Sequence, residues 1–305
     1  MIDKNTTGNI KAIAIIMVML GHLIGAKKID INIAWLDIAT FGVSMFLFVS
    51  GYGLYKSYET NGLNNYFKKK VKKVYIPFAI ATIFVGMSRG FFGDKWSDIV
   101  KTIFFMNPSL PIDGTMWYIY FLALWYILFY IVFFLFSTNT TRLFILLLIS
   151  IAIYNIPFSE KYNIASFLFP FHAFTFVIGV GFAMMGDIKK KARFIIGILL
   201  FSLFLYLFRF HFIKYDYLNH VITSIISAPA IILLFSCLNL NSLLLKFISS
   251  ISYELYLFEG AFRHNNFAPD KTSSCILFFL ITISCAYTFN IFIKMLSKHK
   301  YFLVR

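Results

Sequence analysis

The stretch that decides the fold is Asn9–Ala26, NIKAIAIIMVMLGHLIGA. Lys11 is followed by ten residues of Ala, Ile, Met, Val, Leu and Gly, and then by His22. At about 1.5 Å per helical residue, His22 lies roughly 16 Å along the axis from Lys11. If the helix crosses a bilayer, Lys11 lies near one surface and His22 lies well inside the membrane or toward the far side. An ionisable group at that depth usually faces a cavity or a partner. His22 is therefore either a proton acceptor or a histidine satisfied by a neighbouring helix.

Apolar segments of this kind recur along the 305 residues, of which 60% are hydrophobic and only 13% are charged. This composition excludes an ordinary soluble domain. It predicts an all-α fold, a polytopic integral membrane helical bundle of about ten transmembrane helices. The predicted spans are about 9–26, 33–55, 74–92, 115–136, 143–157, 165–186, 193–211, 218–237, 247–266 and 273–296. Between the spans, a segment around 96–114 predicts an outer loop with a short interfacial helix.

The net charge of +15 is distributed unevenly between the two sides of this bundle. Most of the 28 Lys and Arg residues fall on the side that carries both termini. Because cytoplasmic loops are rich in Lys and Arg, both termini are predicted to be cytoplasmic. The excess of positive charge thus has a topological explanation, and no nucleic-acid partner is expected.

The densest cationic segment is Tyr66–Pro77, where five lysines fall within six positions directly before a span. One interpretation is a topology signal or a site for the headgroups of anionic membrane lipids. The other is a site for the phosphates of a nucleotide-like ligand that approaches from the cytoplasm.

Two further segments mark possible contacts with a ligand. Phe46–Gly53 contains small residues within a bulky span, and these suit either close helix packing or the approach of a ligand. Met116–Tyr120 opens the fourth span with aromatic side chains, which suit either an interfacial belt or a surface on which a sugar stacks.

A late apolar segment carries two carboxylates, Glu254 and Glu259, which are costly if they are buried without a partner. Glu259 and Arg263 have helical i, i+4 spacing, so an ion pair between them is one expectation. A cation from another span is the other. His172, His211 and His220 show no spacing typical of a zinc site, so no metal site is predicted.

Taken together, these stretches resemble acyltransferase family 3, whose members are bacterial membrane proteins that O-acylate cell-surface carbohydrates. The resemblance covers nearly the whole chain, and five motifs occur in the family's order. They are Lys11 with His22, Phe46–Tyr52, Lys70-x-x-Lys73 before Pro77, Trp117-Tyr118 to Leu122, and Ile251–Leu257. Each motif alone is weak, but the ordered set is specific.

The chain departs from the family pattern in two respects. Lysines stand at the first-span and basic-segment positions where the family has arginine, so the charge is kept but bidentate phosphate geometry is lost. Glu259 occupies the place where the late motif usually ends in histidine, so the role of that histidine is not carried over to it.

The resemblance implies one membrane-embedded acyltransferase domain over residues 1–305, in the stand-alone form without a C-terminal esterase-like domain, in a bacterial cytoplasmic membrane. It implies acetyl-CoA or another acyl-CoA as donor and His22 with Lys11 as catalytic residues. His22 would act as general base on a sugar hydroxyl or as a covalent acyl relay. The expected donor-binding residues are Lys69, Lys70, Lys72 and Lys73. The expected substrate-binding residues are Ser50, Tyr52, Trp117, Tyr253 and Glu259.

The expected acceptor is a carbohydrate such as a capsule, O-antigen, exopolysaccharide or lipid-linked sugar, with glycan-assembly proteins as possible partners. Two other classes of function stay open. A proton-coupled transporter or exporter of an envelope glycan or small anion would use His22 to couple protons, although no internal repeat supports it. In a non-catalytic scaffold, His22 would be a packing residue.

Overall fold

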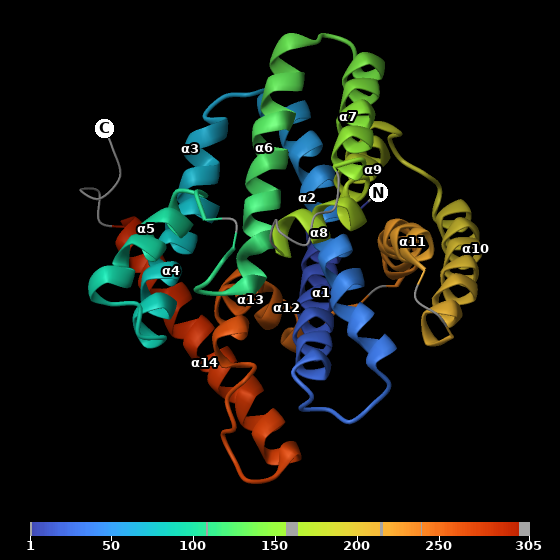
Figure 1. Ribbon diagram of the computed structural model, residues 1–305. Helices are drawn as coiled ribbons and strands as arrows, with labels where there is room; N and C mark the ends of the chain where they lie inside the picture. Colours follow the sequence, from blue (N-terminus) through green and yellow to red (C-terminus); the bar gives the residue numbers. More distant parts are fainter. Residues whose placement is uncertain (1, 108, 157–163, 214–215, 239, 299–305) are drawn as a thin grey trace.

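A computed structural model describes residues 2–107, 109–156, 164–213, 216–238 and 240–298 (Figure 1). Within these ranges the chain forms helices and no strand, as an all-α bundle requires. The helices before the middle of the chain are α1 (Lys4–Gly25), α2 (Asp37–Asn61), α3 (Tyr66–Lys70), α4 (Ile76–Ser88), α5 (Trp96–Ile103), α6 (Trp117–Leu135) and α7 (Asn139–Tyr154). Those that follow are α8 (Ile164–His172), α9 (Thr175–Met184), α10 (Lys190–Phe208), α11 (Tyr217–Phe235), α12 (Leu243–Ser250), α13 (Ser252–Phe262) and α14 (Lys271–Lys298).

Seven of these helical segments are long and apolar enough to cross a membrane, so the chain is a polytopic membrane protein. They match seven of the ten predicted spans. The predicted spans 143–157 and 165–186 correspond to shorter apolar helices, Asn139–Tyr154 and Leu168–Met184. The predicted span 247–266 is divided into α12 and α13 at Ile251, whose backbone leaves the helical conformation. The predicted interfacial helix in the 96–114 segment is present as α5.

Helices α1 and α2 occupy the centre of the bundle, while α10 and α14 lie at its periphery (Figure 1). The α2–α9 contact is especially close, because two glycines face the backbone of the opposite helix. A Cβ at Gly51 would lie 2.1 Å from the carbonyl oxygen of Phe176, and one at Gly179 would lie 2.1 Å from that of Phe48. Helix packing is thus the role of Gly51. Gly53 faces open space instead, with no atom within 4 Å of a built Cβ.

The lysine-rich segment is helical and continuous with the apolar span that follows it. Helix α3, a π-helical turn η2 (Val71–Tyr75) and α4 form one helical unit, Tyr66–Ser88, that is long and apolar enough to cross a membrane. The helix therefore begins before the lysines. This places the lysine side chains around a helix, where its periodicity decides which of them face the protein.

Candidate active site

The first feature of the site is a pair formed by His22 and Glu259, from α1 and α13. His22 Nδ1 lies 2.8 Å from Glu259 Oε1, and Glu259 is completely buried. Glu259 contacts Arg263 only through a backbone hydrogen bond from the Arg263 amide. The expected Glu259–Arg263 ion pair is therefore wrong, and a group from another span is the partner. Arg263 instead hydrogen-bonds through Nε to the neighbouring His264.

This pair determines which nitrogen of the His22 imidazole carries the proton. A carboxylate can only accept, so His22 Nδ1 carries the proton and donates it to Glu259. In the neutral ring, Nε2 then holds the lone pair and can take up a proton or attack a carbonyl. Glu259 Oε2 is buried without a hydrogen-bond partner in the described part of the chain, so His22 is the main polar partner of this carboxyl group. A histidine oriented by a buried carboxylate is a typical arrangement for a general base.

His22 lines a cavity of about 280 Å³ between α1, α2, α6, α8 and α11. Trp117 and His172 form part of its wall, with their rings stacked at a centroid distance of 5.4 Å. His172 is itself held by Ser44, whose hydroxyl lies 3.1 Å from its Nδ1. The cavity thus offers aromatic faces and polar groups side by side, as sites for sugars do.

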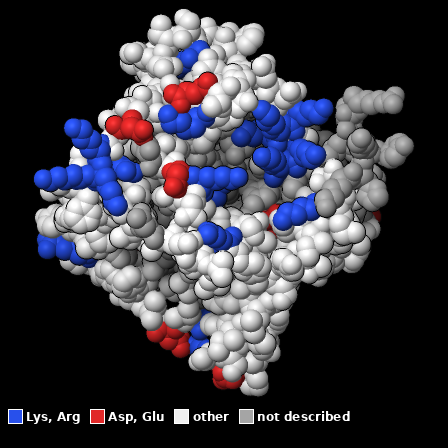
Figure 2. Space-filling view, turned by 180° about the vertical axis from the view of Figure 1, so that it is seen from behind, with Lys and Arg blue, Asp and Glu red and all other residues white. Residues whose placement is uncertain are grey.

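A second cavity, of about 330 Å³, is lined by four cations: Lys11, Lys69, Lys70 and Lys73. None of its described lining residues carries a carboxylate, so the charge within it is purely positive. Figure 2 shows the wider pattern: Lys and Arg side chains gather in the upper half of the face shown, and the lower half is mostly without charge. A concave cationic surface of this kind suits a ligand that carries several phosphates.

Tyr256 of α13 lies between these two cavities, because its side chain lines both. Its hydroxyl donates to the carbonyl oxygen of Thr115, and its ring meets that of Tyr118 edge-on at 5.1 Å. Along α1, Lys11 faces one cavity and His22 the other. The two cavities are therefore adjacent, and Tyr256 is part of the wall of both.

The π-helical turn Val71–Tyr75 contributes Lys73 and Val74 to the wall of the cationic cavity. A π-turn widens the helix locally and is frequent at functional sites. Here the hydroxyl of Tyr253 in α13 donates to the carbonyl oxygen of Val74 at 2.9 Å, which ties the turn to α13. The chain thus anchors the lysine-bearing helix against the same helix that carries Tyr256 and Glu259.

The predicted site residues divide between the two cavities, with two exceptions. Lys11, Lys69, Lys70, Lys73, Ser50 and Tyr253 line the cationic cavity, and His22 and Trp117 line the other, with Glu259 behind His22. Lys72 is exposed and lines neither cavity. Tyr52 is buried elsewhere, where its hydroxyl accepts from the amide of Ile2 at 3.3 Å.

Several residues that complete the site could not be identified from the sequence. His172 and Asp37 line the His22 cavity, but neither belongs to a recognisable motif. Buried Asp113 accepts from the amide and hydroxyl of Thr115 at 3.0 and 2.9 Å and so fixes the turn that leads into Trp117. Tyr256 does belong to the late motif, whose clustered aromatic side chains were the available signal.

Comparison with known proteins adds one match. The family model described as an acyltransferase domain, acyltransferase 3, matches residues 8–291. No curated protein and no solved structure matches this chain.

Proposed function

This chain belongs to acyltransferase family 3 and is thus an acyltransferase of the membrane, and we propose that it transfers an acetyl or other short acyl group from acyl-CoA to a hydroxyl of a cell-surface carbohydrate. The acceptor would be a capsule, O-antigen, exopolysaccharide or lipid-linked sugar, in the cytoplasmic membrane of a bacterium. The observation that carries this proposal is the pair of cavities, one cationic and one containing His22, that meet at Tyr256.

The donor would bind from the cytoplasmic side in the cationic cavity. The phosphates of a CoA thioester would lie against Lys69, Lys70 and Lys73, with Lys11 deeper in the same cavity. Charge-assisted hydrogen bonds of this kind contribute about 1.5–3 kcal/mol each. The acyl end would then extend past Tyr256 toward His22.

The acceptor would bind in the other cavity, with its hydroxyl at His22 Nε2. Nε2 takes the hydroxyl proton as the oxygen attacks the thioester carbonyl carbon. Collapse of the tetrahedral intermediate breaks the carbon–sulfur bond and forms the ester. The CoA thiolate leaves with the proton that His22 returns, so the atoms and charges balance. Buried Glu259 stabilises the imidazolium that forms between these steps.

A covalent relay uses the same tautomer. In that route Nε2 attacks the thioester first, and the acyl-imidazole is then attacked by the sugar hydroxyl. Both routes require the His22–Glu259 pair and both cavities. Acid quenching during a single turnover with radiolabelled acyl-CoA distinguishes them, because only the relay places label on the protein.

The test is the O-acyl content of the envelope glycan, measured by NMR and mass spectrometry in a deletion strain complemented from the chromosome. Wild type restores the acyl groups, whereas His22→Ala lowers the initial rate by about 10²–10⁴-fold, the usual contribution of a general base. Glu259→Gln lowers it as well, because the amide cannot stabilise the imidazolium. His264→Ala is the matched control, since His264 lines neither cavity.

Membrane levels of all variants are matched by immunoblot. Acylation that is equal in the wild type, the deletion and every variant contradicts the proposal for that glycan. In that case proton-coupled transport of the glycan or of an anion is the function to measure next.

A further inference from the structure

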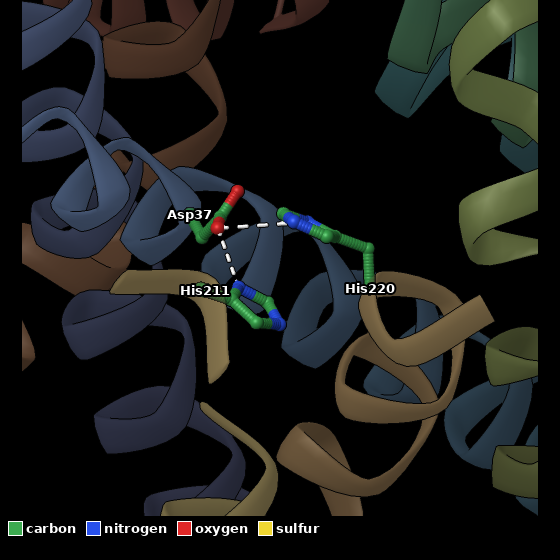
Figure 3. A group of neighbouring side chains, drawn as sticks. All are labelled: Asp37, His211 and His220. Carbon is green, nitrogen blue, oxygen red and sulfur yellow. Dashed lines mark hydrogen bonds and ion pairs between the residues drawn. The ribbon is translucent and has the colours of Figure 1, made fainter. Parts of the chain in front are cut away.

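Three side chains distant in sequence meet beside the His22 cavity (Figure 3). Asp37 is the first residue of α2, His211 lies in the 3₁₀ turn η5 (Arg209–Phe212), and His220 lies in the first turn of α11. One ligand atom from each residue lies within 4.8 Å of the other two. The side chains are largely shielded from solvent, with exposed fractions of 17%, 1% and 14%, respectively.

The hydrogen-bond pattern around His211 shows which of its ring nitrogens faces Asp37 with a lone pair. The Thr223 hydroxyl donates to the carbonyl oxygen of Asn219 at 2.6 Å, so toward His211 Nε2, at 3.3 Å, it accepts. Nε2 therefore carries the proton, and in a neutral ring Nδ1 is a bare lone pair. That lone pair faces Asp37 Oδ2 at 2.6 Å, so either a proton or a metal ion must lie between them.

The second histidine brings a further ring nitrogen to the same carboxylate. The rings of His211 and His220 stack at a centroid distance of 3.8 Å with an interplanar angle of 21°. Two protonated imidazoles in face contact repel each other, so the pair is suited to at least one neutral, lone-pair-bearing ring. His220 Nδ1 is also directed at Asp37 Oδ2, at 3.6 Å, so both rings converge on the same carboxylate oxygen (Figure 3).

The separations agree with a small divalent cation. Ligand bonds of about 2.0–2.1 Å in tetrahedral geometry place neighbouring ligand atoms about 3.3 Å apart. The two separations from Asp37 Oδ2, 2.6 and 3.6 Å, lie on either side of that value, and all three ligand atoms lie within 4.8 Å of one another, so changes of at most about 1.5 Å in these separations would seat the ion. Two imidazoles and one carboxylate form a common zinc ligand set.

We infer that Asp37, His211 and His220 form a zinc-binding site, although their spacing in the sequence predicts none. Three protein ligands leave one coordination position open, the pattern of zinc sites that bind a further ligand. That position opens to the His22 cavity, because Asp37 and His220 are part of its wall. The inference depends on these contacts alone and stands apart from the proposed acyl transfer.

Thr223 is the positioning residue of this site, since its hydroxyl orients His211 without reaching the ion. Loss of such an outer contact usually weakens metal binding by about 10–100-fold. Thr223→Val keeps the shape of the side chain and removes only the hydroxyl.

The experiment uses the full-length protein in detergent, stripped with chelator, dialysed against ZnCl₂ and then analysed by elemental mass spectrometry. The wild type is expected to retain one zinc ion per chain and to give visible absorption bands typical of tetrahedral Co²⁺ after loading with CoCl₂. His220→Asn and Asp37→Asn lose both signals, and Thr223→Val weakens zinc binding by about 10–100-fold. His264→Asn, with its histidine outside the cluster, keeps both.

Folding of each variant is checked by thermal unfolding, so that loss of metal is not confused with loss of structure. Equal zinc retention by the wild type and His220→Asn overturns the inference. So does a wild type that binds neither Zn²⁺ nor Co²⁺, because the cluster is then a His211–Asp37 ion pair with a proton in place of the metal.

Discussion

At the scale of single residues, Lys70 differs from the other lysines of its helix. Its ammonium group lies 4.5 Å from the ring centroid of Tyr126 and 5.6 Å from that of Tyr66. Cation–π contacts of this kind contribute about 0.5–2 kcal/mol and hold the charge in place. Tyr66 is in turn fixed by a hydrogen bond to the carbonyl oxygen of Tyr126 at 2.8 Å. Lys70 is thus a charge that is positioned before any donor arrives.

This predicts a specific kinetic effect of Lys70→Gln. The substitution would remove a charge-assisted contact with the phosphates of the proposed donor, so KM for acyl-CoA is expected to rise at least about tenfold while kcat changes little. Lys72→Gln is the control, because Lys72 belongs to the same helix but is exposed and lines neither cavity. Steady-state rates with purified enzyme provide the measurement. Equal effects of the two substitutions would mean that net charge, and not the cavity, attracts the donor.

Some of these residue roles were predictable from the sequence and others were not. Counting helical residues from Lys11 predicts that His22 lies far along the same helix, and the two side chains line different cavities. The partner of Glu259 could not be deduced, because local spacing favours Arg263 and His22 is 237 residues away. The cluster of Asp37, His211 and His220 combines residues 9 and 174 positions from His211, so no spacing rule reveals it.

At the scale of elements, the contact between α2 and α9 depends on glycine. A methyl group at Gly179 would meet the backbone of Phe48, which cannot move aside as a flexible side chain could. The two helices must therefore separate to accept it. Since α2 also carries Ser50 and Asp37, a shift of α2 would disturb both cavities.

Gly179→Ala is accordingly expected to destabilise the protein by about 1–3 kcal/mol through overpacking. Thermal unfolding in detergent measures it as a lowered midpoint temperature. Gly53→Ala on α2 is the matched control, because its Cβ would meet no atom within 4 Å. That substitution is expected to be neutral or stabilising by up to about 1 kcal/mol, since alanine favours helix. A larger loss for Gly53→Ala than for Gly179→Ala would contradict the packing argument.

The positions of helices could be predicted where the sequence is continuously apolar, but the points at which a helix is interrupted could not. The long spans follow from composition alone. The break at Ile251 occurs inside an unbroken apolar segment, where hydropathy gives no signal. The helical state of the lysine segment was likewise hidden, because charged residues before a span suit a loop or a helix equally well.

At the scale of the whole molecule, the loop 26–36 and the segment 62–65 lie at opposite ends of α2. Asp30 in the former and Asn64 in the latter are both exposed, and only the segment 62–65 adjoins the lysine-bearing helix. If both termini are cytoplasmic, Asp30 lies outside the cell and Asn64 inside.

Impermeant maleimide is therefore expected to label Asp30→Cys but not Asn64→Cys in intact cells, and the reverse in inverted vesicles. The background carries serine at Cys237, Cys275 and Cys285, so that no native thiol reacts. Asp30 pairs with Lys271 only at the exposed surface, where an ion pair contributes about 0–1 kcal/mol, so its substitution is tolerated. The opposite labelling pattern would reverse the assignment of sides and with it the direction of acyl transfer.

The single ring of Tyr256 between the two cavities also has a consequence for the energy balance of the cell. If the cationic cavity opens to the cytoplasm and the His22 cavity to the outer face, as the proposed transfer requires, part of the membrane potential would fall across the layer between them. A charge that crossed it would dissipate about 2.3 kcal/mol per 100 mV. In the proposed transfer, Tyr256, held by the Thr115 carbonyl, would have to admit a thioester and still exclude protons and ions. The side chain between the proposed donor and acceptor sites would then also be part of the permeability barrier of the membrane.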